Sequence, residues 1–402
     1  MVKFEAMEQY WRLLKLLWRK YAGAVAAGSL VAAALLYRLS SLAPHLTAGE
    51  QQSLAASSQL KAIFLTNPLE LPLKLLQWLT TLGPSTHAVF VDRLPSVLLA
   101  LIAFYIFIYI ARRWYGLRST LFGAALFATS AWFLHVARFA GTDSMYLMAV
   151  LSLLAVHVGL HDHQKRPLMF YVWLVVNLIL LFIPGLVWLV AISALLQWRT
   201  IIAAWQHLGN LWNRLAWHVL SLVGIGGLVY TFVRHPALIR VWAGLPEHFA
   251  TWQITLRHIG ESFSALAYRA PFNPQLWVGR LPLLNILALG LLVLGVVFYI
   301  RHWRAQRTQL LFVYFAAGGV LAGLSGGVPL SILMPIAYLV VTAGTAYGLH
   351  FWLRMFPRNP VPRGIGIALV GCLVLVAALY NLKLYYEVWP HNPDTQKIQS
   401  QQ

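Results

Sequence analysis

The sequence predicts an all-helical integral membrane protein, a polytopic bundle of about eleven transmembrane helices. Hydrophobic residues make up 60% of the chain and charged residues only 10%, and apolar runs recur from the first fifty residues to the last forty. Because a helix needs about 20 mostly apolar residues to cross a bilayer, each of these runs is a candidate span. The runs lack the alternation of apolar and polar residues that characterises transmembrane barrel strands. We therefore predict one compact helical domain over residues 1–402.

Clusters of basic residues follow every second predicted span. They are Arg112, Arg113 and Arg118, then Lys165 and Arg166, Arg199 and Arg214, Arg301, Arg304 and Arg307, and finally Arg354, Arg358 and Arg363. Because cytoplasmic loops are enriched in Lys and Arg, this pattern predicts a cytoplasmic N-terminus and an extracytoplasmic C-terminus. The net charge of +19 thus reflects membrane topology and gives no support to nucleic-acid binding. We expect a multi-pass protein of the plasma (inner) membrane.

The segments assigned to the outside are a first loop (40–90), the turn with Arg138 and Asp143, a second large loop (234–280) and the tail (381–402). Residues 1–21 are predicted to form an amphipathic helix on the cytoplasmic surface. All acidic residues except Glu5, Glu8 and Asp162 lie in or next to the outer segments. Any chemistry that depends on a carboxylate is therefore expected outside.

Two helices are predicted within the first outer loop, lying at the membrane interface. The sequence Thr47-Ala-Gly-Glu50 has the form of a helix capping box, and Asn67-Pro-Leu-Glu70 has the same form with proline at the first helical position. On the inner side, residues 199–218 have the apolar spacing of a surface helix. The single cysteine, Cys372, lies in an apolar run and excludes an internal disulfide framework.

Two charged residues, Arg138 and Asp143, lie in the short break between two strongly apolar runs. Ionisable groups at the edge of a hydrocarbon layer are costly and persist mainly where they pair, line a wet cavity or handle a substrate. Both residues are therefore candidates for a functional site on the outer side. The alternatives are that Arg138 extends to the interface or pairs with Asp143, and that Asp143 caps the following span.

Four stretches resemble the polyprenyl-phosphate-sugar-dependent glycosyltransferases of the GT-C superfamily. The resemblance is to the branch with protein mannosyltransferases and aminoarabinose transferases, similar to glycosyltransferase family 39. The stretches are LTAGEQQSL at 46–54, the run from NPLELPLKLLQWL through DRLPSVLL to ARRWYGLR at 67–118, ATSAWFLHVARFAGTDSMYL at 128–147, and PLSILMPIAYLVVTAG at 329–344. The family commonly carries an Asp-Glu pair in the first loop, whereas this chain has Gly49-Glu50.

The resemblance implies transfer of a sugar from a polyprenyl-phosphate donor to an acceptor at the extracytoplasmic face, with inversion. Such a reaction needs a carboxylate base, cations for the departing phosphate, and exclusion of water. Glu50 and Asp143 are the catalytic candidates, and the substrate-binding candidates are Arg138, Arg93, Arg257 and Arg269. Glu50 is equally well explained as a helix cap, and Arg93 as an arginine extending to the interface.

The partners expected are the lipid-linked donor, membrane lipids and an acceptor that is a lipid, a protein or a glycan. No zinc-type ligand spacing is present, so no metal site is assigned, and a divalent cation is left open as a cofactor. Two other function classes stay open: a transporter or flippase for a lipid-linked or anionic solute, and an inactive GT-C relative that binds lipid. The sequence has no internal repeat, and its charges gather at the outer rim, which favours the enzyme over a transporter.

Overall fold

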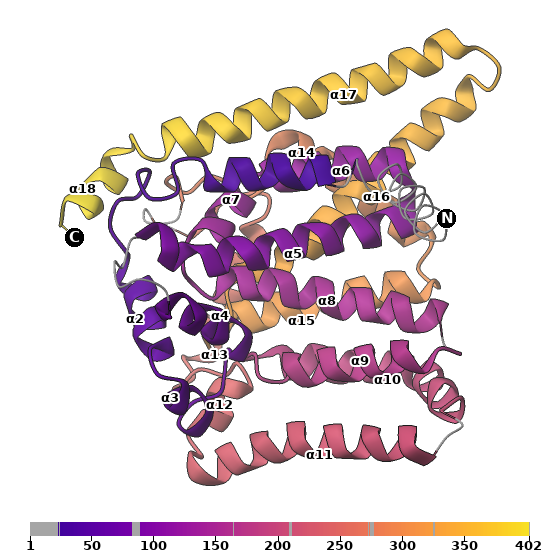
Figure 1. Cartoon of the computed structure of the whole chain (residues 1–402). Helices are drawn as coiled ribbons and strands as arrows, with labels where there is room; N and C mark the ends of the chain where they lie inside the picture. Colours follow the sequence, from indigo (N-terminus) through magenta and orange to yellow (C-terminus); the bar gives the residue numbers. More distant parts are fainter. Residues whose placement is uncertain are drawn as a thin grey trace, which may run out of the picture.

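The computed structural model describes residues 23, 25–82, 89–163, 165–208, 211–271, 273, 277–324 and 326–401. The predicted amphipathic helix over residues 1–21 lies outside these ranges. Within them, the regular secondary structure is helical, which confirms the predicted fold class. Figure 1 shows the long helices side by side, with several short helices gathered at one end of the bundle.

The helices of the bundle are Val25–Leu36, α5 (Val89–Tyr115), α6 (Leu117–Thr129) with the short α7 (Ala131–Arg138), α8 (Asp143–Asp162), α9 (Pro167–Leu180), α10 (Leu186–Gln206), α11 (Leu211–Arg234), α14 (Ile286–Arg301), α15 (Gln306–Gly323), α16 (Met334–Met355) and α17 (Pro360–Lys383). The short elements are α2 (Ala48–Ser57), α3 (Leu60–Leu65), α4 (Leu71–Thr81), α12 (Leu238–Trp242), α13 (Trp252–Ser264), the 3₁₀ turn η1 (Leu330–Leu333), the π-helical turn η2 (Leu384–Val388) and α18 (Pro393–Gln401).

By length and composition, six described helices can cross a membrane, or seven if the bent pair α6 and α7 forms one span. The axes of α6 and α7 differ by 59°. Shorter apolar helices, Val25–Leu36, α9 and α14, lie among them. The membrane class is thus established, while the total of about eleven spans stays a prediction.

The two ends of the bundle differ in character. The first-loop helices α2, α3 and α4 lie at the same end as α12, α13 and α18 (Figure 1). The turns that follow α5, α8, α14 and α16, which carry the clustered arginines, lie at the other end. There Arg113 Nε and Asp162 Oδ2 form an ion pair of 2.7 Å between the ends of α5 and α8. The structure therefore agrees that the basic turns share one end, and the cytoplasmic assignment of that end stays a prediction.

The centre of the bundle is formed by α8 and α16. Of the residues in their most apolar stretches, 78% are buried, against 11% in α11, which therefore lies at the periphery. The pair α14 and α16 packs backbone to backbone. A Cβ atom at Gly295 would overlap the carbonyl oxygen of Val340, and one at Gly344 would overlap that of Leu291. Small residues allow such close helix contacts in membranes, where packing must supply the association energy.

The prediction of a separate surface helix over residues 199–218 is wrong. Helix α10 continues to Gln206, and α11 begins at Leu211. Some apolar side chains of this region are buried near the turn, where the rings of Trp205 and Trp217 lie 4.9 Å apart and Leu208 is fully buried, whereas Trp212 is 73% exposed. The amphipathic pattern therefore came from the ends of two long helices that both pack against α9.

The first of the two predicted capping boxes is confirmed, and the second is wrong. Thr47 caps α2, with reciprocal hydrogen bonds to Glu50. In the second motif, Asn67 Oδ1 accepts from the N–H of Leu69 at 3.1 Å and forms a local turn. Glu70 is the N-cap residue of α4 in a left-handed conformation, with φ of 65° and no side-chain cap hydrogen bond. Pro68 therefore belongs to this turn and not to the first turn of a helix. Helix α4 begins later, at Leu71.

Candidate active site

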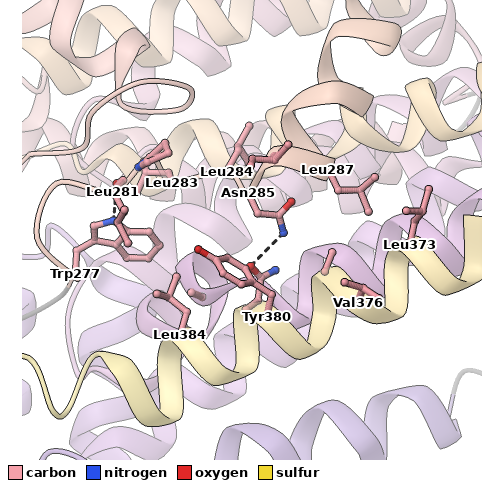
Figure 2. Close-up of a pocket in the computed structure, with 15 residues that line it drawn as sticks. Trp277, Leu281, Leu283, Leu284, Asn285, Leu287, Leu373, Val376, Tyr380 and Leu384 are labelled. Carbon is pink, nitrogen blue, oxygen red and sulfur yellow. Dashed lines mark hydrogen bonds between the residues drawn. The ribbon is translucent and has the colours of Figure 1, made fainter.

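An apolar groove of about 600 Å³ runs between α17 and the segment that leads into α14. Figure 2 shows Leu373, Val376 and Tyr380 of α17 on one side of it and Leu284 and Leu287 on the other. Its polar contact is a hydrogen bond of 3.1 Å from Asn285 Nδ2 to Asn381 Oδ1. Ile286 and Val376 are 91% and 64% exposed, so the groove opens on the side of the bundle. Its lining suits a hydrocarbon chain.

A second, more polar cavity of about 250 Å³ adjoins this groove, because Trp277 and Leu283 line both. Its walls come from α7, α8, η1 and residues of the second large loop. The polar side chains in its lining are His135, Asp143, Asn273 and Ser331. The structure thus places a polar cavity at the end of an apolar groove.

Asp143 is the first residue of α8 and lines the polar cavity. The N-cap residue of α8 is Thr142, which makes no side-chain cap hydrogen bond. No ion pair within 4.0 Å joins Asp143 to Arg138 or to another described residue. Asp143 is therefore neither the N-cap residue of α8 nor a partner of Arg138 in an ion pair, and it borders the polar cavity.

His135 shares the cavity with Asp143 and was not singled out from the sequence. Its side chain is 4% exposed and packs among aromatic rings, with centroid distances of 4.6 Å to Tyr385, 4.8 Å to Trp389 and 5.3 Å to Trp277. The signal in the sequence was its spacing, three residues before Arg138 on one helix, which places both side chains on the same face of α7.

Arg138 is buried but does not line the polar cavity; it borders a separate small space together with Arg93 and Trp389, and it keeps unused hydrogen-bond donors. Its Nη2 donates to the carbonyl of Tyr37 at 2.8 Å, whereas Nε and Nη1 have no partner among the described residues. Its guanidinium lies 5.1 Å and 5.2 Å from the ring centroids of Tyr385 and Tyr386 in η2. These rings offset part of the burial cost of the cation. A buried guanidinium with free N–H donors is suited to bind an anion.

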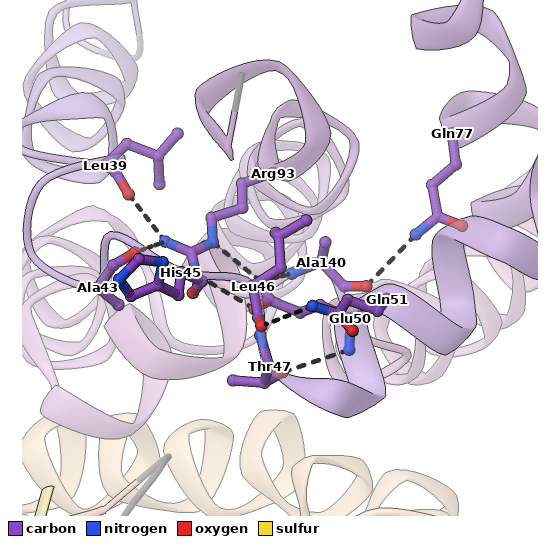
Figure 3. A network of polar contacts seen from close by, with 10 residues as sticks. All are labelled: Leu39, Ala43, His45, Leu46, Thr47, Glu50, Gln51, Gln77, Arg93 and Ala140. Carbon is purple, nitrogen blue, oxygen red and sulfur yellow. Dashed lines mark hydrogen bonds and ion pairs between the residues drawn. The ribbon is translucent and has the colours of Figure 1, made fainter. Parts of the chain in front are cut away.

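The first loop is held over the site by a buried ion pair between Glu50 and Arg93 (Figure 3). Arg93 Nε lies 2.9 Å from Oε1 of Glu50, and Nη2 lies 3.1 Å from Oε2. Glu50 and Arg93 are 2% and 1% exposed. The bidentate geometry is the strongest form of this pair.

Both partners of this pair are fully hydrogen-bonded. The five N–H donors of Arg93 reach Glu50 twice and the carbonyls of Leu39, Ala43 and His45. The Glu50 oxygens also accept from the N–H of Thr47 and of Ala140, each at 2.8 Å. A carboxylate offers about four acceptor positions, and here all are occupied. The capping role of Glu50 is confirmed. Arg93 has no N–H donor left for a phosphate, so the structure differs from the predicted role of Arg93 in substrate binding.

Ala140 connects this clamp to the cavity. Its N–H donates to Glu50, and its carbonyl accepts from Gln77 Nε2 of α4 at 3.3 Å (Figure 3). The backbone between Arg138 and Asp143 is therefore fixed by two residues of the first loop. Sequence reasoning grouped Glu50 with Arg138 and Asp143, and the structure brings all three segments together through this backbone contact.

The other two arginine candidates lie outside the described cavities. Arg257 is 78% exposed and forms a surface ion pair of 2.9 Å with Glu261 on α13. Arg269 is exposed and precedes Ala270 and Pro271, which line the polar cavity. The structure thus places Arg269 beside the cavity and Arg257 on the protein surface.

Glu70 and Lys74 form a second group that the sequence did not indicate. Lys74 is 4% exposed and donates to the carbonyl of Asn67 at 3.1 Å. Burial raises the pKa of Glu70, and the nearby Lys74 ammonium offsets part of this effect. Burial lowers the pKa of Lys74, and Glu70 opposes that change.

No cluster of three or more His, Cys, Asp or Glu side chains that could hold a metal ion occurs in the described ranges.

The structure is thus that of a helical membrane protein in which a buried ion pair holds the first loop and an apolar groove opens on the side of the bundle. Two solved structures share this fold. They are ArnT from Cupriavidus metallidurans in the apo state (14% identity, TM-score 0.49) and bound to undecaprenyl phosphate (15% identity, TM-score 0.50). Each match covers 92% of this chain and 75% of the ArnT chain. No family model and no curated protein sequence matches. The resemblance noted in the motifs is therefore confirmed at the level of the fold, which the chain shares with ArnT.

Proposed function

We propose that the protein transfers a sugar from a polyprenyl-phosphate donor to an acceptor at the extracytoplasmic face of the inner membrane. The observation that carries this proposal is the junction at Trp277 and Leu283 between the apolar groove and the polar cavity. A lipid-linked sugar has the same two parts, a long hydrocarbon chain and a polar phosphosugar. The junction allows each part to lie in a matching environment.

The isoprenoid chain of the donor would lie in the groove between α14 and α17. The groove is open on the side of the bundle, so the hydrocarbon chain of a lipid can enter it while the lipid stays in the membrane. The related fold of ArnT has been seen with undecaprenyl phosphate bound, a lipid of this class. That observation supports a polyprenyl-phosphate lipid as the partner.

The donor phosphate would bind near Arg138. This side chain has two buried nitrogens without a partner in the described part of the chain, and a planar guanidinium can hold two phosphate oxygens at once. As the bond between the anomeric carbon and the phosphate oxygen breaks, negative charge grows on the leaving phosphate. A preorganised cation at this place stabilises that charge in the transition state.

Asp143 would act as the general base. It lines the polar cavity and has no ion-pair partner among the described residues. The acceptor hydroxyl attacks the anomeric carbon opposite the phosphate, its proton passes to the Asp143 carboxylate, and the polyprenyl phosphate departs. One displacement of this kind inverts the anomeric centre.

Glu50, the other catalytic candidate, would be a positioning residue in this scheme. Its four hydrogen bonds leave no acceptor position for a substrate proton, and they hold the backbone at Ala140 that leads to Asp143. The predicted reaction therefore depends on Glu50 through the placement of Asp143.

The test is an assay of the purified protein with a panel of polyprenyl-phosphate sugars and lipid, protein and glycan acceptors. We expect acceptor-dependent release of free polyprenyl phosphate from one donor class. Movement of labelled donor across a vesicle without release would instead support a flippase. Binding of the lipid without either outcome would support an inactive lipid-binding subunit.

The lipid-binding subunit is the second candidate because of Gly49. The family's usual acidic residue at this position is absent, and a Cβ atom at Gly49 would meet open space. An aspartate can therefore be placed there without a clash. If the wild type is inactive and Gly49→Asp gains release of polyprenyl phosphate, the subunit role is supported.

A further inference from the structure

A third cavity, of about 420 Å³, lies at the opposite end of the bundle from the proposed active site. It is lined by the ends of α5 and α8 and the start of α15, and includes Arg113, Trp114, His157, His161, Asp162 and Arg307. Figure 1 shows these ends of α5 and α8 far from α2 and α4. Its volume falls within the roughly 300 to 1,000 Å³ of typical ligand pockets. The proposed sugar transfer makes no use of it.

The cavity carries an excess of positive charge. Its one carboxylate, Asp162, is already paired with Arg113 Nε at 2.7 Å. The second guanidinium, Arg307, lies over the ring of Phe298 at 5.6 Å, a contact that holds it in place. Because Asp162 is neutralised by Arg113, the charge of Arg307 is left to attract an anion.

The start of α15 adds further hydrogen-bond donors. This helix of 18 residues begins at Gln306, and its N-cap residue Ala305 has no side chain that can accept from the first-turn N–H groups. Both residues line the cavity. The positive end of the helix dipole and these N–H groups favour an anion at this position.

A buried histidine gives an independent sign of a missing ligand. His157 is 7% exposed and lines the cavity, and its Nδ1 has no hydrogen-bond partner among the described residues. Buried polar atoms in native proteins are nearly always satisfied by protein, water or ligand. The imidazole of His157 therefore adds a polar group to the wall of the cavity, and its ring nitrogens can donate or accept a hydrogen bond according to the tautomer.

We infer that this cavity binds a phosphate group, carried by an anionic lipid headgroup of the leaflet at the basic end or by a soluble phosphate. Phosphate matches the free charge of Arg307 and the N–H donors at the start of α15, and its oxygens can accept several hydrogen bonds at once. Basic pockets between transmembrane helices bind lipid headgroups in this way, and Trp114 suits the interfacial depth. The inference does not depend on the proposed sugar transfer.

The test measures ligand-induced stabilisation of the purified full-length protein in neutral detergent. In the first arm phosphatidylglycerol is added to the protein, and neutral phosphatidylcholine is the control lipid. In the second arm inorganic phosphate is added, and the control is a buffer of equal ionic strength without phosphate or sulfate. The shift in unfolding temperature gives an apparent affinity in each arm. The variants are Arg307→Gln, Arg113→Gln and His157→Gln, and the control is Arg358→Gln, an exposed arginine at the same end outside the cavity.

We expect phosphatidylglycerol or phosphate to stabilise the wild type and Arg358→Gln alike. Affinity should fall about fivefold or more in Arg307→Gln and Arg113→Gln, as expected for loss of one basic side chain near a charged membrane surface. Selectivity for phosphatidylglycerol identifies a lipid headgroup, and equal stabilisation by inorganic phosphate identifies a soluble ligand. Absence of stabilisation by both, or equal loss in Arg358→Gln, overturns the inference. Because each variant is compared with its own ligand-free state, altered folding stability does not mimic this result.

Discussion

The two carboxylates near the polar cavity differ in what surrounds them. Glu50 is enclosed by four hydrogen bonds, two of them from Arg93, whereas Asp143 lines an open cavity. Removing one member of a buried ion pair leaves the other charge uncompensated, which is strongly destabilising. Removing a carboxylate that faces a cavity has no such effect. The two residues should therefore respond to the same substitution in different ways.

Asp143→Asn should reduce sugar transfer by about 100-fold or more, the range expected for loss of a general base. The folded protein should keep its unfolding temperature, because no ion pair is lost. Steady-state rates and thermal unfolding in detergent check both expectations. Glu261→Gln, which removes an exposed carboxylate on α13, is the matched control and should keep full activity. Full activity in Asp143→Asn would remove Asp143 from the mechanism.

Glu50→Gln should lower stability and transfer together. The amide cannot neutralise Arg93, and breaking a buried pair costs about 3 to 5 kcal/mol. The measurement is the free energy of unfolding of the variant, alongside its activity. The assignment of Glu50 as a positioning residue fails if the variant unfolds at the wild-type temperature yet has lost transfer, since that outcome is expected of a base.

Glu70→Gln should change how stability depends on pH. Burial raises the pKa of Glu70 above 4.5, so its contribution to stability is fully present below that value and is lost as pH rises through the folded-state pKa. The wild type should therefore lose stability relative to the variant as the pH increases from 4.5. Unfolding temperatures of both proteins over this range give the sign. A constant difference would show that Glu70 is not buried as described.

At the scale of elements, the helix contacts near the site depend on close backbone packing. Helices α14 and α16 meet at Gly295 and Gly344, and α14 also forms one wall of the apolar groove. The clamp of the first loop connects α2, α4 and α5 with the turn between α7 and α8. The position of the cavity is therefore determined by contacts between elements far apart in the chain.

Gly295→Ala should destabilise the protein by about 1 to 3 kcal/mol, because the added methyl group overpacks the α14–α16 contact. Its control is Gly290→Ala on the same helix, where a Cβ atom meets nothing within 4 Å. This control should be neutral or slightly stabilising, since alanine favours helix more than glycine does. Unfolding temperatures of the two variants provide the comparison. Equal effects would contradict the packing described for this pair.

At the scale of the whole molecule, hydropathy and charge predicted the helical membrane class and the gathering of the basic turns at one end. Local rules also predicted the capping box at Thr47, because its partners are three residues apart. The same rules failed at Asn67 and over residues 199–218, where a turn and the packing of two helix ends produced patterns that resemble a helix start and a surface helix.

The site was less accessible to sequence reasoning for a physical reason. Glu50 and Arg93 are 43 residues apart, and Glu50 and Ala140 are 90 apart, so only the folded chain brings them into contact. Charge alone marked Arg138 and Asp143 as candidates, and the structure places Asp143 in the polar cavity and Arg138 outside its lining. Charge could not distinguish the free donors of Arg138 from the occupied donors of Arg93, nor indicate the aromatic surroundings of His135.

The central claim is that a lipid-linked sugar is transferred with inversion at the cavity that contains Asp143. The most direct measurement follows a single turnover of wild type and Asp143→Asn with an active donor, and records free polyprenyl phosphate and the anomeric configuration of the product. We predict equal amounts of polyprenyl phosphate and inverted product from the wild type, and neither from Asp143→Asn. A product of retained configuration, or release that is unchanged in Asp143→Asn, would contradict the account.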